Sequence, residues 1–140
     1  MIAQGVMVRT QCEDCGGVLS LDLGQHMLNG QLWWGTVGEC TACPNAWCWE
    51  DTGGTTPARI RDALLAEHGP AQLHLADDGS SRVPVMRALR EVLQLSLSQA
   101  RSMADTLQRT GLVGTLVEME FIADGLQRRS VATTIEMPAA

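Results

Sequence analysis

Two Cys-x-x-Cys pairs constrain this chain more than any other feature of its sequence. The pairs are Cys12 with Cys15 and Cys40 with Cys43. In a tetrahedral zinc site, each such pair supplies two thiolates from one tight turn, and four thiolates complete the coordination shell. We therefore expect a closed, structural Zn²⁺ site held by these side chains. The alternatives are reduced, unliganded cysteines, or disulfides, which the short spacing and the lack of a secretory pattern disfavour.

The chain is acidic, with 10 Lys+Arg against 16 Asp+Glu and a net charge of −6. A general binder of phosphate backbones needs clustered positive charge, so this balance argues against one. The sequence has no lysine, which excludes Schiff-base chemistry and lysine-held phosphates. It has no HExxH or GxSxG motif, and His26, His68 and His74 fall on separate segments. Because four thiolates leave no open position on the metal, we expect a protein that is not an enzyme.

Neither a membrane span nor an export signal is expected. No apolar run approaches the roughly 20 residues that a membrane helix needs. Residues 1–10 lack the charged start and apolar centre of a signal peptide. We expect a protein of the reducing cytoplasm that does not associate with a membrane.

The first half of the sequence alternates short strand patterns with the cysteine pairs. Strands are expected over residues 6–10, 18–23, 31–37 and 46–50, from β-branched runs and alternating apolar residues. Asn29-Gly30 is a typical hairpin turn between the second and third strands. This order of strands and thiolate turns resembles the zinc ribbon family over residues 5–52, so we expect a β zinc ribbon over residues 1–55.

Cys48 and the tryptophans are left over once the metal ligands are assigned. Cys48 is interpreted as a small buried hydrophobe, with a ligand role in place of Cys43, or a free thiol, as alternatives. The four tryptophans are interpreted as the core of a small sheet. The alternative is an exposed aromatic face that grips a peptide or stacks on bases. In that case Trp33, Trp47 and Trp49 are the expected partner-binding residues.

The second half switches between helical and strand periodicity. A short linking helix is expected over residues 56–69, capped by Thr56 and ended by Gly69-Pro70. Ser96 and Gln99 are placed for a capping box at a later helix. The expected order is a strand at 71–76, a turn at 77–81, helices from 83 and 96, a strand at 114–118, a helix at 119–126, and a strand at 131–137 before Pro138. This β-α-α-β-α-β order predicts an open-faced sandwich over residues 70–140, and makes the whole chain α+β.

Residues 71–137 resemble the C-terminal domain of the bacterial ribosomal stalk protein, an acidic large-subunit family that recruits translation GTPases. The resemblance is clearest over residues 83–90 and 95–101, with their sequences VPVMRALR and LSLSQAR. Gln94 and Ser96 replace glycines of the family pattern, and Ser98 stands where a lysine is usual. In that family, the matching face of the first two helices docks elongation-factor GTPases. The resemblance therefore implies a partner-binding face that contains Arg87, Arg90, Leu95, Leu97 and Arg101.

Together these patterns predict a non-enzymatic, zinc-containing adaptor that binds protein partners, such as a translation GTPase or a ribosome-linked factor. The alternative function is a nucleic-acid-binding accessory factor of transcription or translation that uses the tryptophan face. For the arginines, the alternative to partner binding is a solvated helix face, in which Arg87 pairs with Glu91 at i, i+4.

Overall fold

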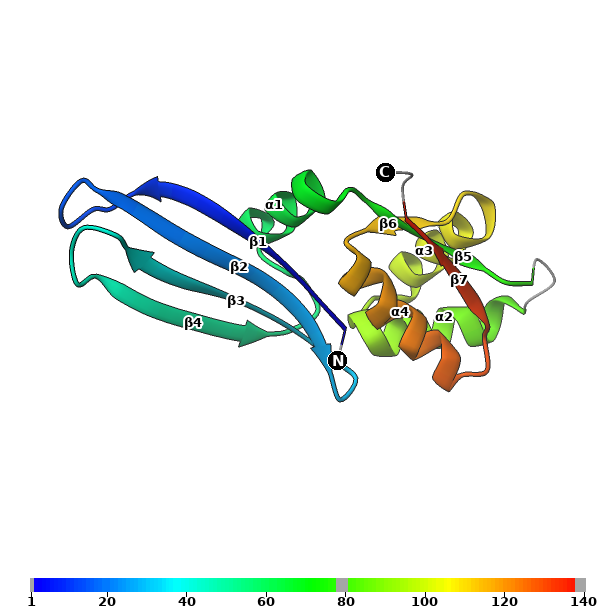
Figure 1. The fold of residues 1–140 in the computed structure, drawn as a ribbon. Coiled ribbons are helices and arrows are strands. Elements are labelled where there is room, and N and C mark those ends of the chain that lie inside the picture. Colours follow the sequence, from blue (N-terminus) through cyan, green and yellow to red (C-terminus); the bar gives the residue numbers. More distant parts are fainter. Residues whose placement is uncertain (1, 78–80, 138–140) are drawn as a thin grey trace. The chain divides into compact units, whose positions relative to one another are not determined.

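The computed structural model describes residues 2–77 and 81–137 (Figure 1). These residues form two antiparallel sheets and four helices, which confirms the α+β class. The chain divides into two compact units, Met1–His68 and Gly69–Ala140. Positions 78–80 of the predicted turn, and Pro138, lie outside the described residues. In the described ranges, no helix combines the length and apolar composition needed to cross a membrane.

The first unit is built on a four-stranded antiparallel sheet with the strand order β1-β2-β3-β4. Its strands are β1 (Ile2–Gln11), β2 (Val18–Leu28), β3 (Gln31–Cys40) and β4 (Ala46–Thr52). Each predicted strand is present but longer, because antiparallel pairing continues past the apolar runs into polar residues. Asn29 and Gly30 form the predicted two-residue hairpin, and both have the positive φ, 53° and 73°, that such a turn requires.

Helix α1 (Ala58–His68) packs against β1 and β2 of this sheet. Its Ile60 and Leu64 side chains are fully buried, on the sheet face that also carries Leu23. Thr56, which precedes the helix, accepts a hydrogen bond from the Gln25 amide at 2.7 Å. The structure therefore makes α1 part of the first unit, and its apolar stripe covers one face of the sheet.

The opposite face of the sheet, which we call the open face, carries no helix of the first unit. Strand alternation and pairing register place on it Ala3, Gly5, Met7 and Arg9 of β1; Ser20, Asp22, Gly24 and His26 of β2; Trp33, Gly35, Val37 and Glu39 of β3; and Cys48, Glu50 and Thr52 of β4. Met7 and Val37 keep 59% and 52% of their surface exposed there. The sheet is thus packed on one side only, as antiparallel sheets commonly are.

The second unit contains a three-stranded sheet and three helices. Its elements are β5 (Ala71–Leu75), α2 (Arg82–Leu93), α3 (Leu97–Arg109), β6 (Leu112–Gly114), α4 (Leu116–Arg128) and β7 (Thr133–Glu136). The strand order is β6-β5-β7, and both pairings are antiparallel. Leu73, Leu89 and Leu126 are fully buried in one core between the sheet and the helices. Apolar residues that alternate along the strands and apolar residues that recur every three or four positions along the helices both contribute to this core.

Capping residues set two helix starts in the second unit. The predicted box at Ser96 and Gln99 is confirmed, with both reciprocal hydrogen bonds present. A second box joins Thr115 and Glu118 at the start of α4. The strand predicted over 114–118 is therefore wrong in its position, because Thr115 caps a helix that begins at Leu116, and β6 is Leu112–Gly114.

Gly125 allows α4 to approach α2 closely, and this contact yields a first prediction. A Cβ at position 125 would lie 2.0 Å from Val92 Cγ2. Alanine gains up to about 1 kcal/mol in helix propensity, but overpacking costs about 1–3 kcal/mol. We expect Gly125→Ala to lower the free energy of unfolding by about 1 kcal/mol. In a Val92→Ala background, the same substitution should be neutral or stabilising, as measured by urea denaturation. Identical effects in both backgrounds would contradict this account of the contact.

Candidate functional site

Both cysteine pairs lie at one end of the first unit's sheet. The β1–β2 connection carries Cys12 and Cys15, and the β3–β4 side contributes Cys40 and Cys43. Leu19 pairs with Cys40, so the start of β2 brings the two connections together, at the end opposite to the β2–β3 hairpin (Figure 1). Residues far apart in the sequence thus meet because of the strand order.

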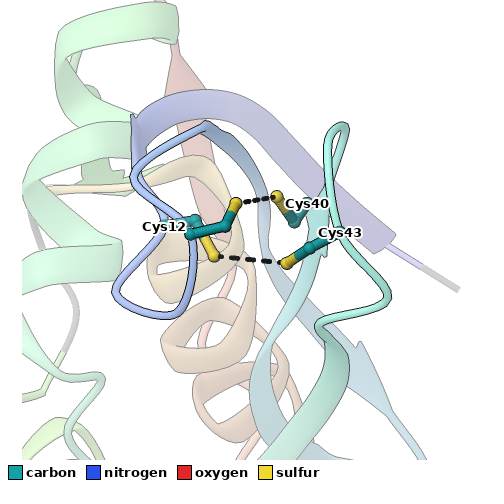
Figure 2. Close-up of side chains that lie close together, drawn as sticks. Cys12, Cys40 and Cys43 are labelled. Atoms are coloured by element: carbon teal, nitrogen blue, oxygen red, sulfur yellow. Dashed lines mark hydrogen bonds between the residues drawn. The ribbon is translucent and has the colours of Figure 1, made fainter.

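The four sulfur atoms form one compact cluster. They all lie within 4.8 Å of one another. The Cys12 and Cys43 sulfurs are 3.8 Å apart, and those of Cys15 and Cys40 are 3.5 Å apart (Figure 2). Zn–S bonds of about 2.3 Å in a tetrahedron place sulfurs about 3.8 Å apart. The cluster therefore fits a metal ion with four thiolate ligands, which supports the predicted metal site.

Hydrogen-bond donors surround the sulfurs. The backbone N–H of Gly17 points to Cys15 Sγ at 3.4 Å, and that of Ala42 points to Cys40 Sγ at 3.3 Å. The Asn45 side-chain amide lies 3.5 Å from Cys12 Sγ. Such donors stabilise thiolates and orient them toward a bound cation.

Sulfurs packed this closely cannot all ionise without a cation among them. The Asn45 amide, followed by the backbone of Cys15, lowers the pKa of Cys12 to about 6. The backbone N–H of Asn45 has the largest single effect on Cys43 and lowers its pKa. Loss of solvent and the neighbouring sulfurs outweigh it and raise the pKa of Cys43 to about 12. A divalent cation bound to all four sulfurs would relieve this competition for protons.

Cys48 is separate from the cluster and exposed on the open face. The interpretation of this residue as a buried hydrophobe is wrong, because β4 is an edge strand and alternation directs residue 48 away from α1. His26 lies two strands and four residues from Cys48 along the register, roughly 15 Å away by strand geometry, so these two residues do not form a thiol–imidazole pair.

The tryptophans do not form one surface. Trp34 is buried, at 5% exposure, whereas Trp47 and Trp49 are 39% and 43% exposed. Trp33 is half-buried on the open face, and Trp47 and Trp49 lie on the other face, that of α1. The core interpretation thus holds for Trp34 and is wrong for Trp47 and Trp49, and Trp33 does not share a face with them.

In the second unit, part of the predicted partner-binding face forms a cavity of about 580 Å³. Its walls are made by Arg87, Arg90, Glu91, Gln94, Leu95 and Arg129. Leu97 is 55% exposed and Arg101 is exposed, and both begin α3 outside this lining. The structure thus brings Arg87, Arg90 and Leu95 together and does not include the other two predicted residues in this lining.

Sequence reasoning did not find Arg129, which ends α4 and forms an ion pair with Glu91. The Arg87–Glu91 ion pair considered from the i, i+4 spacing is not formed; Glu91 faces Arg129 instead. The two residues are 38 positions apart, so no local pattern indicates the pairing. Only the packing of α2 against α4 produces it.

A metal ion bound by the four cysteines would join two chain connections and would have a complete tetrahedral shell. A bound Zn²⁺ would supply cross-linking at this end of the sheet. The Asn45 amide and the two backbone N–H groups would keep the thiolates oriented.

Comparisons of the chain with protein-family models, curated proteins and solved structures find no match.

Proposed function

We propose that this protein is a non-enzymatic adaptor, in which a zinc ribbon is joined to a unit that binds a translation GTPase or a ribosome-linked protein. The observation that carries the proposal is the arginine- and leucine-lined cavity of the second unit. It contains three of the five residues that the ribosomal stalk resemblance implies, Arg87, Arg90 and Leu95, and the element order β-α-α-β-α-β accords with an open-faced sandwich.

The charges of this face favour an acidic protein surface as its partner. Arg129 pairs with Glu91, so it neutralises the one carboxylate in the lining. Arg90 donates to the Leu95 carbonyl at 3.4 Å. Among residues 2–77 and 81–137, Arg87 has no ion-pair partner, and its charge is available to a ligand. Arginines around an apolar anchor are typical of protein interfaces.

Zinc serves a structural role in this proposal. The sulfur cluster closes the end of the sheet, and structural sites with four thiolates contribute folding energy directly. The ribbon would thus be a stable platform for the second unit. The acidic chain, with its net charge of −6, favours recruitment of proteins over general binding of nucleic acid.

The test measures binding of a purified elongation-factor GTPase from the same organism to the full chain. We expect Arg87→Glu/Arg101→Glu to weaken binding by at least about tenfold, because reversed charges meet the acidic partner with repulsion. A matched control is Arg59→Glu/Arg109→Glu, which makes the same charge change on exposed positions of α1 and α3. If both variants and the wild type melt normally and bind the GTPase equally, this face is not the binding site.

A second candidate function is nucleic-acid binding through Trp47 and Trp49. Their exposure, 39% and 43%, favours it, since exposed rings can stack on bases. Asp51 shares their face and would repel phosphates. The two candidate functions are distinguished by a titration with single-stranded RNA at low salt, in which tryptophan emission is measured. Unchanged emission would rule out nucleic-acid binding through these tryptophans.

A further inference from the structure

The open face of the first unit contains a cavity of about 280 Å³ that the proposed function does not use. It is lined by Asp22, Gly24, His26, Gly35, Thr36, Val37, Cys48, Trp49 and Glu50. Most of these residues belong to the open face, so the cavity is a trough in the exposed surface of the sheet. It lies apart from the cysteine cluster, which occupies the end of the sheet.

The floor of the trough contains Gly24 and Gly35, and Gly5 continues their row on β1 outside the lining. Gly5 pairs with Gly24, and Gly24 pairs with Gly35. Only Gly35 is required by the fold, because a Cβ there would lie 2.8 Å from the Trp49 carbonyl oxygen. A Cβ at Gly24 would meet nothing nearer than 3.8 Å, and one at Gly5 nothing nearer than 3.5 Å.

Gly24 therefore weakens β2 without a packing reason, whereas the Gly5 carbonyl is contacted by His68 Nε2 at 2.8 Å. Glycine inside a strand usually marks a bulge, a bend or a place where a ligand approaches the backbone. The pairing through both positions is continuous, so a bulge is not the reason. The free space above Gly24 allows a ligand to approach its backbone.

The walls of the trough include the imidazole ring of His26 and two carboxylates. His26 stacks on Trp33, with ring centroids 6.2 Å apart and planes within 4°. On β2, Asp22 lies two residues before Gly24 and His26 lies two residues after it, so the carboxylate and the ring flank this glycine. Glu50 of β4 pairs with Gly35 and so continues the row of glycines across the sheet. In the part of the chain that the structure describes, neither carboxylate has an ion-pair partner.

The charged residues of the whole open face also favour a basic ligand. Asp22, Glu39 and Glu50 oppose a single cation, Arg9, on the strand positions of this face. Such a surface repels phosphates and attracts basic groups. Because Asp22 and Glu50 lie two strands and two residues apart, roughly 12 Å between Cα atoms, two basic side chains of one extended segment can reach both.

From this trough we infer a second docking site, which binds an extended basic segment of a partner protein. Its backbone lies across the glycine floor between His26 and Val37, and its arginine side chains meet Asp22 and Glu50. Arginine suits the site because its planar guanidinium bonds carboxylates with two parallel N–H groups. The site is independent of the arginine-lined cavity in the second unit.

The test is an NMR titration of the full, zinc-loaded chain with acetyl-Arg-Gly-Arg-amide. We expect the amide signals of Gly5, Gly24 and Gly35 to shift at millimolar peptide. The same peptide with citrulline in place of arginine should leave these signals unmoved, since it keeps the shape and loses the charge.

Three variants sharpen the test. Gly24→Val should abolish the shifts at Gly5 and Gly35 while the chain melts no lower than the wild type, because the position has room and β-branched residues favour strands. Asp22→Asn/Glu50→Gln should weaken binding by about tenfold. Asp62→Asn/Glu67→Gln removes the same charge from exposed positions of α1 and should leave binding unchanged.

The inference is overturned if the arginine peptide moves none of the glycine signals, or if the citrulline peptide moves them equally. It is also overturned if Gly24→Val binds as the wild type does, or if a short single-stranded RNA shifts the same signals more strongly than the peptide. None of these results depends on whether a GTPase binds the second unit.

Discussion

Replacing Cys40 with serine is expected to abolish stoichiometric Zn²⁺ binding and to unfold the first unit. Cys40 is 7% exposed and belongs to the four-sulfur cluster. Structural zinc contributes about 10–16 kcal/mol of apparent binding energy in small zinc modules, as much as the about 5–15 kcal/mol that stabilises a whole domain. All four tryptophans lie between residues 33 and 49, so tryptophan emission reports on this unit alone. Elemental analysis measures the metal, and EDTA treatment of the wild type should reproduce the emission change.

Cys48→Ser is the matched control for this prediction. Cys48 is exposed on the open face and outside the cluster, so its replacement should retain one zinc per chain and a normal melting transition. The metal centre would be refuted if Cys40→Ser kept its zinc. It would also be refuted if neither the substitution nor EDTA altered the melting of the first unit.

Leu89→Ala is expected to destabilise the second unit by about 3 kcal/mol, within the range of about 2–5 kcal/mol for a large-to-small core substitution. Leu89 is fully buried on α2 and contributes to the core of this unit. Most helical residues of the chain belong to α2, α3 and α4, so ellipticity at the helix minimum follows this unit during urea denaturation. Tryptophan emission should stay unchanged, because the first unit has its own core.

The matched control here is Leu97→Ala, which removes the same atoms from a side chain that is 55% exposed. We expect a stability change below about 0.5 kcal/mol. Because Leu97 stands in the proposed partner-binding face, this variant should still bind the GTPase more weakly. Equal destabilisation by the two leucine variants would show that Leu89 is not part of a packed core.

Local chemistry explains why much of the fold could be predicted. The Asn29-Gly30 turn sets the β2–β3 register by itself, since both residues adopt positive φ and leave Leu28 opposite Gln31. The Ser96 capping box was also predictable, because both hydrogen bonds join residues three positions apart. Thr115 and Glu118 have the same spacing, so a capping box also marks the start of α4 in the sequence. The β-branched and apolar residues around them predict a strand instead, which the structure does not have at 116–118.

The sequence and the tertiary structure agree most clearly on the cysteine cluster. Spacing alone indicates that each pair can hold a metal from one turn. The antiparallel order of four strands then brings the turns to the same end of the sheet, with sulfur separations that fit one ion. The sequence indicates the ligands, and the strand order explains how ligands from two turns meet.

The sequence by itself determined the residues of the metal cluster, the α+β class and most helix and strand positions, because these depend on contacts between residues close in the chain. Only the tertiary structure decided that α1 covers the Leu23 face, that Glu91 meets Arg129, and that Gly24 and Gly35 meet in a trough. Each of these depends on which distant segments become neighbours. That choice is made by the packing of whole elements, and a local pattern carries no record of it.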